Sequence, residues 1–269
     1  MMAVVGFKKI IWEHYRTNGR RFAWRHVADP YKVLVSEVML QQTQTSRVKV
    51  KYPEFIKQFP DFKHLANAST AEVLRAWQGL GYNRRALYLK KLAERVIKDF
   101  GGKLPRDPAI LKTLPGIGAA TAGSVAAFAF NSPTIFIETN IRAVFLHFFF
   151  AGKNKVSDQE ILPLVEKSLD RANPREWYYA LMDYGVKLKS EIENPSRRSK
   201  HHAKQSKFAG SNREKRGLII KTLLAQPETT ISQLTRVLKL SPTNIRALVT
   251  TLAAERLVKI SRQKISLAK

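Results

Sequence analysis

The sequence predicts an all-α protein whose last part is a smaller module of the winged-helix type. Three observations lead to this prediction. Over the first 188 residues, apolar side chains recur every three or four positions in nearly every segment, which is the period of an amphipathic helix. Residues 189–212 are polar and basic, with a single aromatic residue. From about residue 213 the helical period returns, and a β-prone stretch ends the chain.

The predicted helices are bounded by Gly, Pro, Asn or Asp, which commonly begin or end a helix. In the first part they cover residues 7–19, 30–43, 70–81, 83–102, 107–114, 118–130, 139–150, 158–172 and 174–188. In the last part they cover 213–226, 230–240 and 241–257, before the β-prone 258–267. Three short helices and a terminal hairpin follow the order of a winged helix. We therefore expect a core over 1–188, a basic linker over 189–212 and a winged-helix-like domain over 213–269.

The chain is strongly basic. Among its 269 residues, 47 are Lys or Arg and 21 are Asp or Glu, which gives a formal charge of +26 and a pI near 10.4. Such an excess is typical of a protein that binds a polyanion. Nucleic acid is the first candidate and an anionic membrane surface is the second. No apolar run approaches the roughly 20 residues of a membrane span, and the N-terminus has charges where a signal peptide is apolar, so we expect a soluble, cytoplasmic protein.

The sequence predicts no metal site held by cysteine or histidine. The chain has no cysteine, which excludes disulfides, thiolate catalysis and zinc or iron–sulfur sites held by cysteine. His201 and His202 are adjacent and lack acidic partners in the sequence around them, so we interpret them as surface residues rather than metal ligands.

A tight turn, LPGIG, separates two predicted helices at residues 114–118. Its glycines, Gly116 and Gly118, leave backbone N–H groups uncovered, while Leu114 begins the turn. The turn leads into a helix N-terminus, whose dipole favours an anion, so a phosphate can bind there without base preference. An ordinary helix–helix turn is the alternative, and the pentapeptide alone does not separate the two.

Two carboxylates stand in unusual sequence contexts. In SEVMLQQTQ, residues 36–44, Glu37 lies in an apolar stretch that is followed at once by uncharged polar side chains. In FIETNIRAV, residues 136–144, Glu138 follows an apolar run and opens the next helix. Glu138 is either a helix-start carboxylate stabilised by the helix dipole or an acid held at the mouth of a cleft.

Together these segments resemble the helix-hairpin-helix DNA glycosylase superfamily, and within it the adenine DNA glycosylases. The resemblance runs from about residue 7 to 186 and rests on RRFAWR (20–25), PYKVLVSEVMLQQTQ (30–44), LANAS (65–69), GLGYNRRALYL (79–89), LPGIGAATAG (114–123), IETNIRAV (137–144) and ALMDYG (180–185). It implies a helix-hairpin-helix glycosylase core that acts on double-stranded DNA with a mismatched or damaged base. It also implies a monomer.

The resemblance assigns roles to several of these residues. Breaking an N-glycosidic bond needs a proton for the departing base and negative charge near the sugar, and two carboxylates can divide those tasks. By resemblance Glu37 is the acid that protonates the purine, and burial beside Val35 and Val38 is expected to raise its pKa. By resemblance Glu138, with Asn140, takes the second task, which is to place negative charge near the sugar. Residues matching those that enter the duplex and fill the space of a flipped base are Gln41, Gln42, Thr43 and Tyr82.

This chain departs from the family at three positions near the expected site. Glu138 stands where the family has an aspartate. Ala120 stands where endonuclease III-like enzymes have a Schiff-base lysine, so covalent catalysis and strand cleavage are not expected. Tyr179 replaces a glutamine or glutamate that contacts the flipped adenine, which leaves the preferred base open, whereas Trp24 and Arg25 keep the family's base-pocket pattern in part.

Two larger parts of the family are also missing. The four cysteines of an iron–sulfur cluster are absent, and basic residues 194–208 stand in their place. There Arg197, Arg198 and Lys200 could contact phosphates, and a solvated tail is the alternative. No cofactor is expected to be required, although the 114–118 hairpin is a candidate site for a structural monovalent cation. The winged-helix-like segment replaces the family's Nudix-like domain, which reads 8-oxoguanine.

The sequence thus predicts a monofunctional, cluster-free DNA glycosylase for base-excision repair. The expected target is adenine mispaired with guanine or 8-oxoguanine, and the expected product is an abasic site. Removal of uracil, thymine or another damaged base from a mismatch is the alternative within the same class. A non-catalytic DNA-binding protein is the alternative from another class. No membrane partner is expected. In a prokaryote we expect the protein to be associated with the nucleoid.

Overall fold

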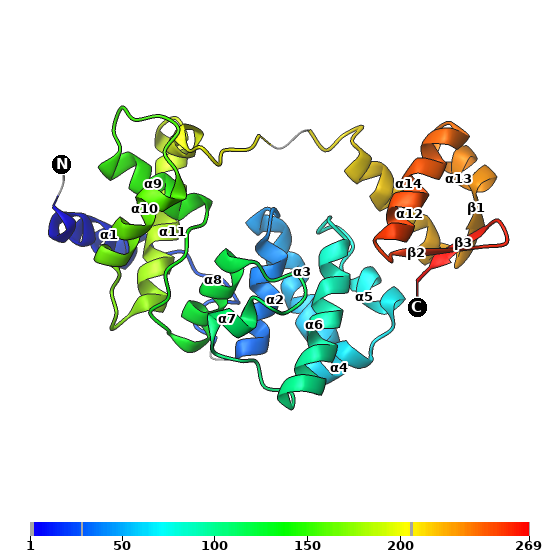
Figure 1. Cartoon of the computed structure of the whole chain (residues 1–269), viewed down its shortest axis with the longest axis horizontal. Helices are drawn as coiled ribbons and strands as arrows, with labels where there is room; N and C mark the ends of the chain where they lie inside the picture. Colours follow the sequence, from blue (N-terminus) through cyan, green and yellow to red (C-terminus); the bar gives the residue numbers. More distant parts are fainter. Residues whose placement is uncertain (1–2, 28, 205–206, 269) are drawn as a thin grey trace. The chain divides into compact units, whose positions relative to one another are not determined.

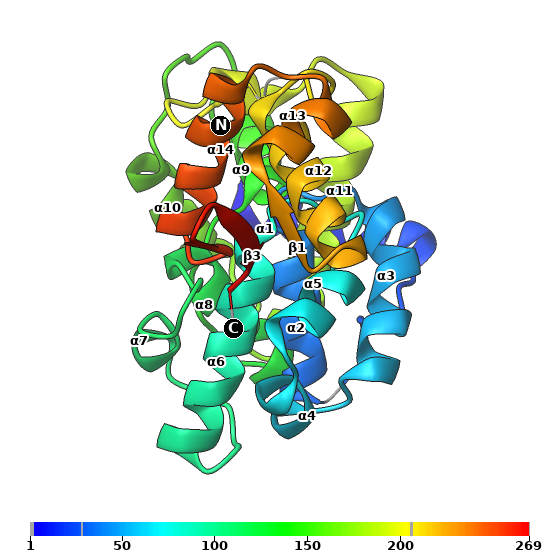
Figure 2. The ribbon, with the colours of Figure 1, turned by 90° about the vertical axis from the view of Figure 1, so that its right-hand side faces the viewer.

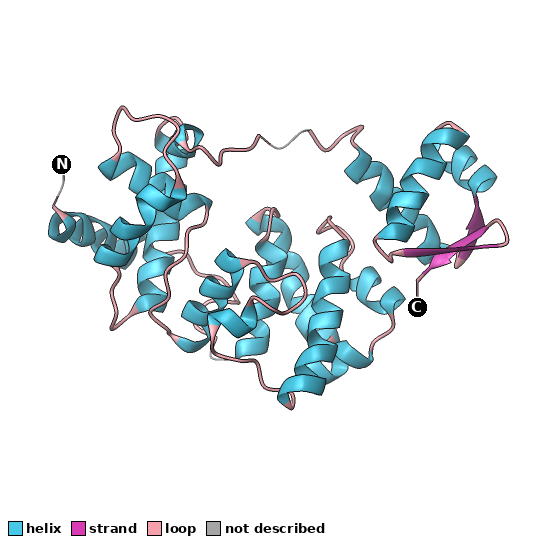
Figure 3. Cartoon of the chain, in the orientation of Figure 1, coloured by secondary structure: helices cyan, strands magenta, loops and turns pink. Residues whose placement is uncertain are grey.

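The structure is a computed structural model that describes residues 3–27, 29–204 and 207–268. Helices make up most of these residues, and the described strands form one three-stranded sheet near the C-terminus (Figures 1 and 3). The chain divides into two compact units. The first consists of residues 1–34, 105–113 and 117–204, and the second of 35–104, 114–116 and 205–269. The predicted helical class is confirmed, and none of the described helices is long and apolar enough to cross a membrane.

The first unit is built around a central long helix. Its elements are α1 (Val4–Asn18), the start of α2 (Pro30–Leu40), α7 (Pro108–Leu111), α8 (Ala119–Phe130), α9 (Thr139–Phe149), α10 (Asp158–Ser168), α11 (Pro174–Glu191) and the 3₁₀ helix η1 (Pro195–Arg198). Helix α11 packs against α1, α8 and α9. Phe7 of α1, Phe145 of α9 and Trp177 of α11 are fully buried and meet in edge-on or tilted aromatic contacts, so apolar faces of the expected helical period form this core.

The helical part of the second unit contains two helices that the apolar pattern did not predict. It comprises the rest of α2, α3 (Thr45–Gln58), α4 (Phe62–Asn67), α5 (Thr70–Ala76) and α6 (Arg84–Phe100). In α3 a proline and interleaved charges obscure the period, yet Val48, Tyr52 and Phe55 are buried on one face. Helix α4 has six residues, too few to show a period, and Asp61 caps it by accepting from His64 N–H.

The C-terminal module has the connectivity of a winged helix. It contains α12 (Asn212–Ala225), β1 (Glu228–Thr230), α13 (Ile231–Leu238), α14 (Pro242–Ala254), β2 (Val258–Ser261) and β3 (Lys264–Leu267). The strands form an antiparallel sheet in the order β1-β3-β2, with Ile265 opposite both Thr229 and Ile260. Figure 2 shows this sheet beside α12, α13 and α14. The predicted module is confirmed, and β1 is an addition to the predicted hairpin.

The segment predicted as a linker contains ordered structure. Its first residues, 189–191, end helix α11, and η1 packs on α9. Ser196 Oγ donates to the Thr139 carbonyl at 3.0 Å, while Arg198 Nη2 donates to the Leu146 carbonyl at 2.8 Å. Arg198 also donates to the Phe150 carbonyl. It therefore provides hydrogen-bond donors for carbonyl groups at the C-terminal end of α9. Gln205 and Ser206 of the predicted linker lie outside the described residues.

Candidate functional site

The candidate residues are divided between the two units. The second unit holds Glu37, Gln41, Gln42, Thr43, Tyr82, Leu114 and Gly116. The first unit holds Trp24, Arg25, Gly118, Glu138, Asn140, Tyr179, Arg197, Arg198 and Lys200.

Glu37 lies three residues before the end of α2. Its neighbours Val35 and Val38 are buried, as the apolar pattern predicts. Glu37 itself is only half-buried. The side chain therefore combines apolar neighbours with access to solvent, an arrangement that suits a group exchanging a proton with a substrate.

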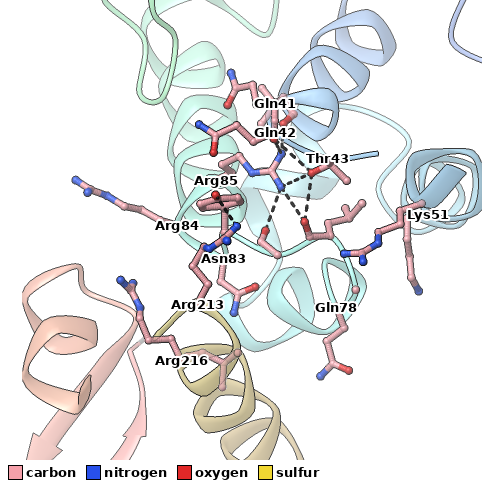
Figure 4. Close-up of a pocket in the computed structure, with 18 of the residues that line it drawn as sticks. Gln41, Gln42, Thr43, Lys51, Gln78, Asn83, Arg84, Arg85, Arg213 and Arg216 are labelled. Carbon is pink, nitrogen blue, oxygen red and sulfur yellow. Dashed lines mark hydrogen bonds between the residues drawn. The ribbon is translucent and has the colours of Figure 1, made fainter. Parts of the chain in front are cut away.

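Arg85 fixes the polar turn that follows Glu37's helix. This buried side chain on α6 donates from Nη1 to the carbonyls of Val38, Met39 and Gln41 at 2.8, 2.9 and 2.6 Å. From Nη2 it donates to Thr43 Oγ1 at 2.8 Å and to the Leu80 and Gly81 carbonyls, both at 3.1 Å. Figure 4 draws the bonds to Thr43, Leu80 and Gly81. Through its bonds Arg85 joins the turn at residues 41–43 to the loop at residues 78–82. Burial lowers the pKa of Arg85 to about 10, so it remains a cation at neutral pH.

Both joined segments carry a non-glycine residue with left-handed backbone. Gln42 has φ of 53° and Tyr82 has φ of 46°, and Gly81 before Tyr82 has φ of 73°. Such conformations cost free energy and concentrate at functional sites. Tyr82 is 37% exposed, and its ring lies 5.6 Å from the Arg85 guanidinium carbon. The structure thus presents an amide side chain and an aromatic ring on two loops held by one arginine.

A cavity of about 1350 Å³ opens beside these two loops. All residues that line it belong to the second unit. Its walls come from the 41–44 turn, the start of α3, residues 78–89, the turn residues Pro115 and Gly116, and the C-terminal module. Figure 4 shows Arg213 and Arg216 of α12 across from Thr43. We call this cavity the loop groove.

The glycine turn between α7 and α8 packs tightly on α6. Gly116 has φ of 80°, and a Cβ atom there would lie 2.8 Å from Tyr88 Cβ. Only glycine fits this position without movement of Tyr88. Gly118, with φ of −90°, is the residue before α8 and is exposed. The first N–H groups of a helix lack intrahelical acceptors, so the exposed start of α8 suits an anion, while Leu114 is buried as an anchor.

Glu138 begins α9 as its capping residue. Its Oε1 accepts from the backbone N–H groups of Asn140 at 2.7 Å and Ile141 at 2.9 Å. The helix-start interpretation is therefore realised. A second role remains open to Oε2 of this half-buried side chain, because Oε2 accepts from Asn140 Nδ2 at 3.2 Å and engages neither of these backbone groups.

Lys189 of α11 completes this cluster. Its Nζ donates to Asn140 Oδ1 at 2.8 Å. Gly185, one turn earlier on α11, allows the approach, since a Cβ atom there would lie 2.5 Å from the Asn140 carbonyl oxygen. Burial lowers the pKa of Lys189, and the nearby Glu138 carboxylate opposes this shift. Three polar side chains from two packed helices thus form one connected group.

The base-pocket candidates lie in an aromatic and ionic stack. Tyr179 is 5% exposed and its ring stacks on Phe128 at 4.5 Å between centroids. The Arg25 guanidinium carbon lies 4.4 Å from the Tyr179 ring centroid and 5.2 Å from the Phe22 ring centroid. Trp24 is buried and stacks on Phe22 at 4.8 Å. These side chains fix the position of the 20–25 segment on α11.

Asp183 holds the same segment by charge. It accepts from Arg25 Nη2 at 2.7 Å and Nη1 at 2.9 Å, and from the Arg20 backbone and Nε, both at 2.7 Å. Burial alone would raise the pKa of Asp183, but the hydrogen bonds and charges of Arg25 and Arg20 hold it below its usual range. The aspartate of ALMDYG is therefore a buried partner of two arginines.

In the basic segment after α11, one of the three predicted phosphate-binding side chains makes hydrogen bonds to backbone carbonyls within the protein. Arg198 is used at the end of α9, whereas Lys200 is exposed and Arg197 pairs with Glu193 at 2.6 Å on the surface. A cluster held by four cysteine thiolates does not fit this chain, because it has no cysteine. Among the described residues no group of three or more His, Cys, Asp or Glu side chains could hold a metal.

Three residues of this architecture were not identified as functional from the sequence. Arg85 was detectable, because a cation occupies the apolar face that Leu89 and Leu92 continue on α6. Asp183 was quoted in a motif without a role, and only the fold reveals its two arginine partners. Nothing in the sequence distinguished Lys189 from its neighbours, because it stands in a basic stretch.

Several known proteins are similar to this chain in sequence or in fold. The profile of the HhH-GPD superfamily base excision DNA repair proteins matches residues 35–168. An adenine DNA glycosylase of Mycobacterium tuberculosis is 43% identical over 131 residues, which cover 48% of this chain and 43% of that protein. A thymine/uracil-DNA glycosylase of Methanothermobacter thermautotrophicus is 29% identical over 183 residues, 67% of this chain and 83% of that protein.

A solved structure of a thermostable thymine-DNA glycosylase superposes with a TM-score of 0.65 at 27% identity. The match covers 71% of this chain and 90% of that one. The chain spans about half of the length of the curated adenine DNA glycosylases that it matches. The resemblance seen in the sequence is confirmed: the chain belongs to the HhH-GPD superfamily of base excision DNA repair proteins, and within it resembles the adenine DNA glycosylases.

Proposed function

We propose that the protein is a monofunctional DNA N-glycosylase that removes a flipped-out base from a mismatched or damaged duplex. The observation that carries this proposal is the arrangement fixed by Arg85. It joins the 41–43 turn and the Tyr82 loop directly beyond the helix that carries Glu37. Flipping a base leaves a gap in the stack that side chains must fill, and an acid must protonate the departing base. A loop pair of this kind beside an acid serves both needs.

The proposed reaction is hydrolysis. Glu37 donates a proton to the base as the N-glycosidic bond breaks, and the bonding electron pair leaves with the base. A water oxygen then bonds to C1′ and the water gives one proton to the Glu37 carboxylate, which leaves an abasic site and restores the acid. Glu138 supplies negative charge to the developing oxocarbenium ion. Ala120 offers no amine, so no imine forms and the DNA strand remains intact.

Adenine opposite guanine or 8-oxoguanine is the proposed target, because several curated adenine DNA glycosylases are 32% to 43% identical to the chain over the matched residues. Thymine or uracil in a mismatch is the second candidate. The thymine/uracil-DNA glycosylase relative and the thymine-DNA glycosylase structure favour it. Tyr179 stands where the adenine branch has an amide or acid, which adds to this second candidate.

A strand-scission assay tests the proposal. Five labelled duplexes carry A opposite 8-oxoguanine, A opposite G, U opposite G, T opposite G, and hypoxanthine. Alkali after incubation should cleave the first two, and without alkali the strands should stay intact. The Glu37→Gln variant should bind the same duplexes but release no base. Near-parental release by this variant would contradict the assignment of Glu37, and no cleavage of any duplex by the parent would contradict glycosylase activity.

Borohydride provides an independent check, since it traps imines between an enzyme amine and DNA. No trapped complex is expected. A monomeric state and a monovalent cation at residues 114–118 are further proposals that follow from the resemblance, and a cytoplasmic location is a further proposal that follows from the sequence pattern. Each stays a prediction.

A further inference from the structure

Helix α12 lies against the exposed tyrosine of the 78–82 loop. Arg213 Nη1 donates to Tyr82 Oη at 3.0 Å, and its guanidinium carbon lies 5.6 Å from the Tyr82 ring centroid. Arg213, Arg216, Gly217 and Lys221 of α12 line the loop groove together with Gln42 and Tyr82. The C-terminal module therefore forms one wall of the groove, and the loops proposed to enter DNA form the other (Figure 4).

The loop groove is strongly basic. Seven Arg and Lys side chains line it against two glutamates. Four of the basic residues, Arg47, Lys51, Arg84 and Arg85, lie on α3 and α6, and α12 supplies three more. One glutamate, Glu255, pairs with Arg216. Arg85 is buried and bonded to backbone carbonyls, and Lys51 pairs with Glu54. The other cations, interleaved with amide side chains and a tyrosine, have the composition of a surface that follows a nucleic acid backbone.

The distribution of charge within the module points to its first helix. In helix-turn-helix proteins the second helix of the motif enters the major groove, and here that helix is α14. Helix α14 carries one basic residue, Arg246. Helix α12 carries four, Arg213, Lys215, Arg216 and Lys221, against the single acid Glu214.

We propose that the C-terminal module binds DNA through α12, as the second wall of the loop groove, and that Arg213 and Lys221 contact phosphates of the strand that passes Tyr82. The ligand is the backbone of double-stranded DNA at the position where the loops enter it. The location of this strand rests on the proposed function, whereas the binding of DNA by α12 does not require catalysis. Helix α14 takes no part in this contact.

Two double variants with equal charge change test the proposal. Arg213→Ala with Lys221→Ala removes two cations from the groove wall. Arg236→Ala with Arg246→Ala removes two exposed cations from α13 and α14, neither of which lines the groove. Affinity for a duplex with A opposite G is measured by fluorescence anisotropy across a salt series. Circular dichroism melting confirms that both variants fold.

Each phosphate contact contributes about 0.9 to the slope of log affinity against log salt. The α12 variant should therefore lose about 2 units of slope and bind roughly 30-fold more weakly at about 0.1 M salt. The α13–α14 variant should keep the slope and lose less than about threefold. Equal losses in the two variants would overturn the proposal, because bulk charge would then explain them. A larger loss in the α13–α14 variant would overturn it in favour of α14.

Base excision by the parent is measured in the same preparations. Salt-dependent binding that involves α12 without excision would contradict the proposed glycosylase while leaving the role of α12 intact. Excision with no effect of the α12 substitutions on affinity would contradict the role of α12 alone.

Discussion

Lys189 and Glu138 are linked through one side chain. Lys189 Nζ donates to Asn140 Oδ1 at 2.8 Å, and Asn140 Nδ2 donates to Glu138 Oε2 at 3.2 Å. The two hydrogen bonds connect α11 with the start of α9 and limit the rotation of the Glu138 carboxylate. The Lys189 cation thus lies one side chain away from the Glu138 carboxylate, whose negative charge the proposed mechanism uses.

Replacing Lys189 should disturb the reaction more than the fold. In Lys189→Met the stem is kept and the ammonium is lost, so Asn140 and Glu138 lose their orientation and the single-turnover rate should fall roughly ten- to a hundredfold. Burial lowers the pKa of Lys189 below its usual 10.5, so the parent rate should decline as pH rises through that lowered pKa. The variant should lack this alkaline decline. Identical pH profiles for parent and variant would show that Lys189 is structural only.

Glu138→Gln separates the two roles of Glu138. The amide oxygen can still accept from the Asn140 and Ile141 N–H groups, so the free energy of unfolding should change by less than about 1 kcal/mol. The negative charge is lost, and the single-turnover rate should fall roughly a hundredfold or more. Glu138→Asp keeps the charge and should retain activity. A glutamine variant as fast as the parent would leave Glu138 as a helix cap alone.

Arg85→Lys should destabilise the protein even though it keeps the charge. A lysine has three donors on one atom and cannot reproduce six bonds to acceptors on both sides of a planar fork. The free energy of unfolding in urea should drop by about 2 kcal/mol or more. Arg84→Lys is the control, because Arg84 is exposed and should change it by less than about 0.5 kcal/mol. Equal effects would mean that the Arg85 bonds add no stability.

The sequence predicted what depends on local pattern. The long amphipathic helices, the LPGIG turn and the order of the winged helix follow from periodicity and turn residues, and the structure confirms these elements. Helix α3 was missed, because its buried face of Val48, Tyr52 and Phe55 is interrupted by charges and Pro53. Glu37 was expected to be buried like its neighbours, but it lies at the edge of the apolar face and is half-buried.

Partners that are backbone atoms could not be predicted. Arg85 and Arg198 bind carbonyl oxygens of distant segments, and a carbonyl has no signature in the sequence. Arg198 therefore resembled a solvent-exposed charge in a basic run. The Lys189–Asn140 bond depends on how closely α9 and α11 approach at Gly185, which only the packed fold reveals.

Gly116 and Gly118 should respond differently to alanine. Gly116→Ala places a side chain at φ of 80° and 2.8 Å from Tyr88 Cβ, so the unfolding free energy should fall by about 2–4 kcal/mol. Gly118→Ala meets nothing within 4 Å and has an ordinary φ of −90°, so its cost should stay below about 1 kcal/mol. Urea titration of both variants measures the difference. Equal losses would show that Gly116 is not fixed by its contact with Tyr88.

Asp183 should make stability depend on pH in the acid range. Its pKa in the folded protein lies below its usual value, because Arg25 and Arg20 donate to it. The resulting stability is complete above the ordinary aspartate pKa of about 3.9 and is lost as pH falls through the lowered value. Asp183→Asn leaves Arg25 buried without its charge partner, so at pH 7 the variant should be less stable by about 3–5 kcal/mol. Urea titrations from about pH 7 to about pH 2.5 should show this difference shrinking as the parent's carboxylate takes up a proton. A difference that stays constant over the whole range would mean that the ionisation of Asp183 contributes nothing, and that the neutral hydrogen bonds alone hold the 20–25 segment on α11.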